Sequence, residues 1–312
     1  MIERVCAVVV TFNRKVLLAE CLSGLRGQTR KLDHVLVIDN KSTDGTSEFV
    51  KDEFPDVELV AMMDNLGGAG GFHEGVRRAY DAGYDWIWLM DDDAEPTPSA
   101  LEKLLAAVPT DVVAGAGSKE VLALCPLIHG VHANRVQSNH HKFITRFFQE
   151  KSLAPGPTKS RCVPIDADAF VGPLFSREGV RLLGFPRAEY FLWVDDLEYT
   201  YRFSQQGACI LVADAIILHK DRPAFTAPIK LYYGHRNYVD FVLRRATKAA
   251  RDRNNLPWRV FVGVLLRALM SSRHSAALLR ASFRKGSGIR PSEALFPILG
   301  FIHGVLGRAG KY

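Results

Sequence analysis

Short apolar runs alternate with helical patterns along the first 90 residues, and this alternation constrains the fold more than any other feature of the sequence. The runs cover residues 6–11, 34–39, 57–61 and 85–90. The last of them, DWIWLM, has only one polar residue, which is typical of a parallel strand covered on both faces. Strands that alternate with helices predict an α/β fold with a wound sheet.

The rest of the chain changes character twice. Periodicity is lost over residues 118–160, which include the PGP run at 155–157, and we expect irregular structure there. After Phe225 the sequence is basic and rich in Leu, Phe and Arg, which predicts a helical appendage. The expected helices are residues 15–25, 43–54, 71–82 and 231–248 and one from Arg177, with later strands at 210–212 and 216–218 and regular structure over 163–175. We therefore expect an α/β domain over residues 1–225 and a helical region over 226–312.

Composition limits the class of protein. The chain has 312 residues, 47% of them hydrophobic, which is enough for one large core with or without an appendage. Its net charge of +6 suits anionic partners such as nucleotide phosphates or an acidic membrane surface. We expect no nucleic-acid partner, and we leave the oligomeric state open.

The five cysteines have no Cys-x-x-Cys spacing, so reduced thiols in a cytoplasmic protein are expected. The first residues lead directly into a strand pattern, which indicates no signal peptide. A spanning helix needs roughly 20 apolar residues in a row, and no stretch reaches that length. The expected location is the cytoplasm, with peripheral contact at the inner face of the cell membrane as an alternative.

Three carboxylates, Asp91, Asp92 and Asp93, follow the strand DWIWLM directly. In open α/β sheets, ligands bind at the carboxyl ends of the strands. Adjacent carboxylates repel one another, so burying them there favours a shared cation, and Mn²⁺ or Mg²⁺ prefers such oxygen ligands. The alternative is a solvated acidic turn before the helix that follows Pro98.

Polar residues also close the first two strands, at the sheet edge where the three carboxylates are expected. Thr11, Asn13 and Arg14 follow the first strand, and Asp39 and Asn40 follow the second. Asp39 is suited to accept hydrogen bonds from a base or ribose, and Arg14 to contact a base or phosphate. Ordinary strand-end turns are the alternative.

A glycine-rich segment, NLGGAGGF at residues 65–72, opens the helix after the third strand. Its glycines permit close approach of the backbone to a ligand, and the helix N-terminus that follows favours an anion. The spacing matches neither a dinucleotide-binding fingerprint nor a P-loop. A tight turn without a ligand is the alternative.

A second acidic pair, Asp195 and Asp196, lies in the aromatic segment FLWVDDLEY. Apolar neighbours can raise a carboxyl pKa towards the working range of a general base, and Trp193 offers a stacking surface to a sugar ring. His219, at the end of a later strand, is a candidate metal ligand. A helix start at the acidic pair and a structural histidine are the alternatives.

Together these segments resemble the family 2 inverting glycosyltransferases of GT-A fold, over roughly residues 4–245. TFNR, VIDN, DNLGGAGGF, WLMDDDA, FLWVDDLEYTYR and a later LH occur in the order that the family shows. NLGGAGGF with WLMDDDA, and YYGHRN at 232–237, look most like bacterial galactofuranosyltransferases and rhamnosyltransferases. One departure is Val194, which stands between Trp193 and the acidic pair, where family members often have Trp directly before the pair.

The resemblance implies roles for single residues. Asp91 and Asp93 would bind the metal with His219, and Asp196 would be the catalytic base. The implied nucleotide-sugar site comprises Thr11, Asn13, Arg14, Asp39, Asn40, Asn65, Gly70 and Asp92. Trp193 and Asp195 would bind the acceptor.

The implied activity is metal-dependent, inverting transfer of a hexosyl group to a hydroxyl of a glycan or lipid-linked acceptor in cell-envelope polysaccharide synthesis. UDP-galactofuranose is the first choice of donor, and dTDP-rhamnose is the alternative. A sugar-nucleotide nucleotidyltransferase is a further alternative, although the N-terminus shows no triphosphate loop. A non-catalytic carbohydrate- or membrane-binding module would explain the basic tail but not both acidic clusters.

The apolar stretches 257–270 and 291–306 carry Arg259, Arg267 and His303 among Leu, Val, Ile and Phe. Interfacial helices show this pattern, and a membrane contact would suit a lipid-linked acceptor. Packing on the catalytic domain or a dimer interface is the alternative.

Overall fold

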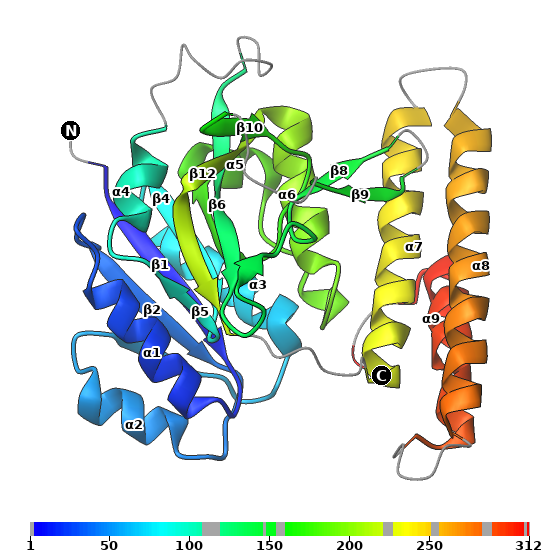
Figure 1. Ribbon diagram of the computed structural model, residues 1–312, viewed down its shortest axis with the longest axis horizontal. Coiled ribbons are helices and arrows are strands. Elements are labelled where there is room, and N and C mark those ends of the chain that lie inside the picture. Colours follow the sequence, from blue (N-terminus) through cyan, green and yellow to red (C-terminus); the bar gives the residue numbers. More distant parts are fainter. Residues whose placement is uncertain are drawn as a thin grey trace. The chain divides into compact units, whose positions relative to one another are not determined.

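The computed structural model describes residues 3–107, 119–145, 148–153, 160–220, 227–250, 256–282, 289–308 and 311 (Figure 1). The strands are β1 (Val5–Thr11), β2 (His34–Asp39), β3 (Glu58–Ala61), β4 (Trp86–Asp91), β5 (Ala94–Pro96), β6 (Val121–Gly130), β7 (Arg135–Val136), β8 (Lys142–Ile144), β9 (Glu150–Ser152), β10 (Cys162–Pro164), β11 (Val171–Ser176) and β12 (Ala208–His219). The α-helices are α1 (Lys15–Arg26), α2 (Thr46–Glu53), α3 (Gly67–Asp81), α4 (Ala100–Leu105), α5 (Arg177–Leu183), α6 (Asp195–Gln206), α7 (Pro228–Ala250), α8 (Leu256–Ser282) and α9 (Phe296–Val305). Two 3₁₀ turns, η1 (Ala188–Tyr190) and η2 (Pro291–Leu295), complete the described elements.

A mixed sheet in the order β10-β12-β6-β11-β4-β1-β2-β3 forms the centre of the N-terminal part. β1 pairs in parallel with both β2 and β4, so the carboxyl ends of these strands meet at one edge of the sheet. β11 is antiparallel to β4 and β6, and β5 pairs with the end of β12. The predicted wound α/β sheet is confirmed, and its antiparallel strands make it a mixed sheet.

Helices cover both faces of this sheet. On one face, α1, α2 and α4 pack through Leu22, Val50 and Leu104. On the other face, α3 and α6 pack through residues such as Phe72 and Phe203. Every residue of β1 is buried as a result, which is why that strand is an unbroken apolar run.

The expectation of irregular structure over residues 118–160 is wrong for the part described. β6 is a ten-residue strand between β12 and β11, and β7, β8 and β9 follow it. Its sequence, VLALCPLIHG, is nearly all apolar because both faces are covered, but Pro126 within it hides the strand. The PGP run at 155–157 lies outside the described residues.

Two further expectations need correction at the level of single elements. The two short strands expected at 210–212 and 216–218 are one strand, β12, with an irregularity between Val212 and Ile216. Helix α3 begins at Gly67, four residues before the expected start at Gly71, because the glycines themselves are helical.

The chain divides into two compact units. The first consists of residues 1–143, 152–188 and 196–222, and the second of residues 144–151, 189–195 and 223–312. In the second unit α7 packs along both α8 and α9. This unit also takes in the short segment 189–195, which precedes Asp196 in the sequence. None of the helices in the described residues is both long enough and apolar enough to cross a membrane.

Candidate active site

The carboxylates after β4 are held by residues from the end of β1. The Thr11 hydroxyl donates to Asp92 Oδ2 at 2.8 Å. The Arg14 guanidinium lies 3.2 Å from Asp92 Oδ1 and 2.7 Å from Asp93 Oδ2. Asp92 and Asp93 are buried, whereas Arg14 is nearly half exposed. The Arg14 guanidinium therefore offsets the charge of two adjacent carboxylates while one of its faces stays exposed to solvent.

The two acids differ in their proton affinity. Burial raises the pKa of Asp92 to about 6, against the opposing charge of Arg14. Burial also acts to raise the pKa of Asp93, but hydrogen bonding and charge from His219, together with Arg14, hold that pKa below its usual value. Asp93 is consequently the member of the pair that stays ionised most readily.

His219 reaches this cluster from the end of β12, as the sequence predicted. Its Nε2 lies 3.4 Å from Asp93 Oδ1, and its Nδ1 lies 2.7 Å from Oε1 of Gln137. A ligating histidine usually donates its second N–H to such an acceptor, which fixes the ring and its tautomer. Gly130 leaves room for this contact, since a Cβ there would lie 2.6 Å from Nε2 of Gln137. Gln137 falls in the stretch expected to be irregular, so no sequence pattern indicated this role.

These residues offer donor atoms that suit a divalent ion. Oδ1 of Asp93 is buried without a hydrogen-bond partner, although it faces the His219 ring. In the described part of the chain, His, Cys, Asp and Glu side chains form no group of three or more placed to hold a metal. Mg²⁺ and Mn²⁺ commonly take only one or two protein carboxylates and complete their shell with phosphates and water. Asp91, the last residue of β4, stays a predicted ligand.

The turn after β1 and the turn after β2 are joined by hydrogen bonds. Asn13, in a left-handed conformation with φ of 55°, accepts a hydrogen bond from the Thr43 amide at 2.7 Å. Asp39 is buried and accepts from the Ser42 amide at 2.8 Å and the Ser47 hydroxyl at 2.5 Å. The structure thus brings the predicted nucleotide residues together, and it shows that Asp39 also fixes the turn itself.

The glycine-rich segment is tied to the same edge. The Asn40 side-chain amide donates to the Gly67 carbonyl at 3.0 Å, while its Oδ1 is buried without a partner. Oδ1 of Asn65 accepts from the Gly67 amide at 2.8 Å, which shapes the turn before α3. A Cβ on Gly70 would lie 2.4 Å from Leu66 Cβ, and one on Gly71 would lie 2.6 Å from Val10. Gly71 is therefore needed for close packing of α3 on β1, whereas Gly70 leaves room for Leu66 at the start of the helix.

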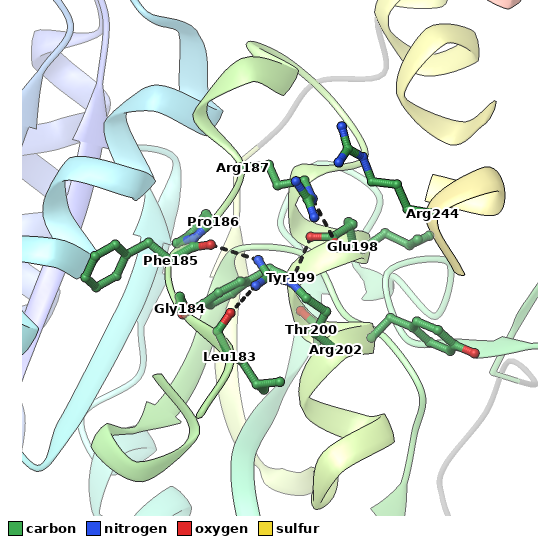
Figure 2. A network of polar contacts seen from close by, with 12 residues as sticks. Leu183, Gly184, Phe185, Pro186, Arg187, Glu198, Tyr199, Thr200, Arg202 and Arg244 are labelled. Carbon is green, nitrogen blue, oxygen red and sulfur yellow. Dashed lines mark hydrogen bonds and ion pairs between the residues drawn. The ribbon is translucent and has the colours of Figure 1, made fainter. Parts of the chain in front are cut away.

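Asp196 stands in the first turn of α6, and an ion-pair network fixes that helix (Figure 2). Glu198 is buried and lies 3.0 Å from Nε of Arg202 and 3.4 Å from Nε of Arg187. Arg202 also donates to the carbonyls of Leu183 and Phe185, so α6 is bound to the segment after α5. The Asp196 carboxylate itself accepts from the Leu197 amide at 2.7 Å.

Helix α6 packs beside the strand that neighbours the three carboxylates. The Thr200 hydroxyl lies 2.8 Å from the Asp196 carbonyl and 3.1 Å from that of Asp168. Phe170 lies two residues after Asp168, and its carbonyl accepts a hydrogen bond from the Asp91 amide at 3.1 Å. The Phe170 ring contacts the ring of Tyr199 on α6. The predicted base and the predicted metal ligands are thus connected through one short segment, residues 168–170.

A buried histidine–carboxylate pair supports that segment. Nδ1 of His141 lies 3.0 Å from Oδ1 of Asp168, and both side chains are fully buried. Neither residue was given a role from the sequence, because the partners are 27 positions apart. The pair is a structural support for the segment 168–170.

The two predicted acceptor residues belong to the second compact unit. Trp193 is 38% exposed, and Asp195 is buried. Trp193 and Val194 both have positive φ, at 66° and 70°. The inserted Val194 therefore lies in a left-handed bend directly before the acidic pair.

Comparison with known proteins decides the family. Residues 6–123 match the family described as Glycosyl transferase family 2. The galactofuranosyltransferase GlfT1 of Mycolicibacterium smegmatis is 33% identical over 213 residues, which cover 66% of this chain and 67% of that protein. This chain belongs to glycosyltransferase family 2. It is an enzyme of the transferase class, as its sequence predicted.

Two further comparisons extend this result. The N-acetylglucosaminyl-diphospho-decaprenol L-rhamnosyltransferase of Mycobacterium tuberculosis is 24% identical over 302 residues, covering 89% of this chain and 94% of that enzyme. The crystal structure of GalNAc-T7 with UDP, GalNAc and Mn²⁺ matches 80% of this chain and 50% of its own, with a TM-score of 0.58 and 15% identity. At that identity the likeness concerns the fold alone, and it confirms the GT-A architecture.

Proposed function

We propose that this family 2 enzyme transfers galactofuranose from UDP-galactofuranose to a hydroxyl of a glycan or lipid-linked acceptor, with inversion and with a divalent metal. The observation that carries the proposal is the cluster at the carboxyl end of β4, where Arg14, Asp93 and His219 meet. The choice of sugar is supported by the similarity to a galactofuranosyltransferase over two thirds of both chains.

In this proposal the residues at the sheet edge hold the donor. Arg14, half exposed above the acids, contacts the diphosphate or the base, and Asn40 offers its buried Oδ1 to the nucleoside. Asp92 lies beside the donor ribose or sugar, anchored by the Thr11 hydroxyl. The N-terminus of α3 adds a favourable field for the phosphates.

Asp93, His219 and, by resemblance, Asp91 would hold Mn²⁺ or Mg²⁺. A bound ion supplies positive charge to the diphosphate leaving group. Asp93 is suited to this role because its Oδ1 is buried without a hydrogen-bond partner and faces the His219 ring. Gln137 keeps the His219 ring turned so that Nε2 faces Asp93.

Asp196 is the proposed base. It takes the proton from the acceptor hydroxyl as that oxygen attacks the anomeric carbon from the face opposite the diphosphate. The bond to the new oxygen forms while the bond to the leaving phosphate oxygen breaks, and configuration inverts. A general base must lie within hydrogen-bond reach of that hydroxyl, so its position matters as much as its pKa.

A thermal-shift panel tests the donor and metal parts of the proposal. UDP, dTDP, GDP and CDP are each added with and without Mn²⁺ or Mg²⁺. A ligand that binds only the folded state stabilises it by about 2.7 kcal/mol at a hundred times its dissociation constant. Metal-dependent stabilisation by UDP alone supports the proposal, and no shift with any nucleotide contradicts it.

dTDP-rhamnose is the second candidate donor, because the chain resembles a rhamnosyltransferase over most of its length. Selective stabilisation by dTDP in the same panel would favour this donor over UDP-galactofuranose. Loss of nucleotide binding in EDTA would at the same time argue against a non-catalytic binding module.

We also infer that the C-terminal helices touch the inner face of the cell membrane. α8 exposes Leu265 and Leu269, and α9 exposes Ile302 and Val305. The double variant Leu265→Glu, Leu269→Glu should reduce flotation with anionic liposomes several-fold. Equal recovery of the wild type and the variant in the soluble fraction would contradict the membrane contact.

A further inference from the structure

The segment that leads into Asp196 is in an unfavourable backbone conformation. Phe191, Trp193 and Val194 have φ of 63°, 66° and 70°, in the left-handed region that side chains other than glycine rarely adopt. For Val194 the cost is greatest because it is branched at Cβ. Such a conformation persists only when surrounding contacts impose it.

Asn237 of α7 provides those contacts. Its Nδ2 lies 3.0 Å from the Tyr190 carbonyl, 3.0 Å from the Leu192 carbonyl and 2.7 Å from the Trp193 carbonyl. The side chain is buried, so these hydrogen bonds are shielded from water. The two N–H groups of one amide thus lie within hydrogen-bond distance of three carbonyls of one short segment, with one hydrogen shared between two of them.

Arg236 orients the Asn237 amide and makes further hydrogen bonds to the same segment. Its Nε donates to Oδ1 of Asn237 at 2.8 Å, which leaves Nδ2 facing the carbonyls. Its Nη2 lies 3.1 Å from the Glu189 carbonyl and 2.8 Å from the Tyr190 carbonyl. The guanidinium also stacks over the Tyr233 ring at 4.9 Å. The Arg-Asn pair of the YYGHRN motif therefore contacts main-chain carbonyls of the segment 189–193.

Gly234, one turn earlier on α7, makes room for Trp193. A Cβ at position 234 would lie 2.8 Å from Cε3 of the indole. Phe191 packs on Tyr233, with ring centroids 5.0 Å apart. Neighbouring residues of α7 thus hold both the side chains and the backbone of the segment before α6.

We propose that Asn237 and Arg236 are positioning residues, which hold the segment 189–194 so that Asp196 begins α6 in a fixed place. Relaxation of Trp193 and Val194 to negative φ would turn their peptide planes and shift the start of α6. Glu198 and Arg202 hold the next turns of the helix, so the shift would fall on Asp195 and Asp196. The inference rests on the proposed role of Asp196 as base.

The variant Asn237→Ala tests this inference, since alanine is the best helix former and α7 is retained. We expect kcat for sugar transfer to fall about 100-fold, the effect of a small misplacement of a reacting group. The dissociation constant of the metal–nucleotide complex should stay within twofold of wild type. Hydrogen exchange of the peptide covering 189–196 should become faster.

Val239→Ala is the matched control. Val239 is buried on the same helix, close to Gly304 of α9, and its substitution destabilises the second unit by removing packed methyl groups. It should leave kcat and exchange of the 189–196 peptide near their wild-type values. An equal fall in kcat in both variants would show a general loss of stability and overturn the proposal.

Arg236→Lys serves if Asn237→Ala does not fold, because a lysine keeps the charge but cannot contact Asn237 and two carbonyls together. A fall in kcat of about tenfold supports the proposal, and kcat within threefold of wild type in the folded variant overturns it. Absence of transfer by the wild type would instead refute the proposed function. Hydrogen exchange of 189–196 would then still decide whether Asn237 holds the segment.

Discussion

Asp92 and Asp93 are held by side chains that contact their carboxylates, whereas the segment before Asp196 is held through its main-chain carbonyls. At the end of β4, Thr11, Arg14 and His219 contact the acid oxygens directly. Before α6, the described contacts are made to main-chain carbonyls. The difference suits the proposed tasks, because a metal ligand needs charge and geometry at its oxygens, while a base must approach a mobile hydroxyl.

The largest expected effect is on the rate of sugar transfer, and it distinguishes the role of Asp196 from that of the carboxylates after β4. Asp196→Asn should lower sugar transfer by about 10³-fold, because the amide cannot accept the proton. Metal-dependent binding of the nucleotide, measured by calorimetry, should stay within twofold of wild type. Transfer at more than a tenth of the wild-type rate would show that Asp196 is not the base.

A smaller effect is expected at the metal end. Gln137→Leu removes the acceptor of the His219 ring and should weaken Mn²⁺ binding about 10- to 100-fold, as the loss of such partners does in other sites. Electron paramagnetic resonance of free Mn²⁺ in the presence of nucleotide gives the affinity. Gln205→Leu, on the exposed end of α6, is the control and should change nothing. Equal affinities in both variants would remove His219 from the metal site.

The free energy of unfolding of the second unit should fall at acidic pH. Burial, with the charges of Arg267 and His274 nearby, lowers the pKa of His235 to about 2, far below its unfolded value. The folded state therefore favours neutral His235, so its stability is complete above about pH 6.5 and declines as the pH falls below that value. The loss should reach about 2 kcal/mol at pH 5.

Urea unfolding at pH 8, 7, 6 and 5 measures this effect. His235→Gln cannot take up a proton and should show a smaller fall in the free energy of unfolding below pH 6.5. An identical pH dependence in the variant would exclude His235. The pKa of His274 is lowered as well, by burial and Arg267, so part of the dependence should remain in the variant.

The smallest expected effect is the loss of stability when the positive charge of Arg14 is removed from beside Asp92 and Asp93. Arg14→Met leaves Asp92 and Asp93 buried without their cation. Since Arg14 is nearly half exposed, the cost in EDTA should be only about 1 kcal/mol. Saturating Mn²⁺ should reduce the difference in Tm from the wild type, because the metal neutralises the same oxygens. A difference that is the same in EDTA and Mn²⁺ would contradict a shared cation site.

Local patterns were sufficient to predict strands β1 to β4 and the presence of helices between them. β1, β2 and β4 follow continuous apolar runs, and their polar ends identify the sheet edge that holds Thr11, Asp39 and Asp92. β6 was missed because Pro126 lies within it, and Gln137 because its partner is 82 positions away. The contacts of Asn237 with residues 190–193 were likewise invisible, since they depend on tertiary packing between distant segments.

The second compact unit is assembled from segments far apart in the chain, and this has a consequence for biosynthesis. Residues 189–195 are synthesised before α7, so Asn237 cannot yet hold their carbonyls. Strands β1 to β4, with the residues proposed to hold the nucleotide, are synthesised earlier still. A growing chain therefore acquires the elements for donor binding well before its proposed base can be fixed in place. On the proposed positioning of Asp196, a truncated translation product that stops before α7 would lack catalytic competence.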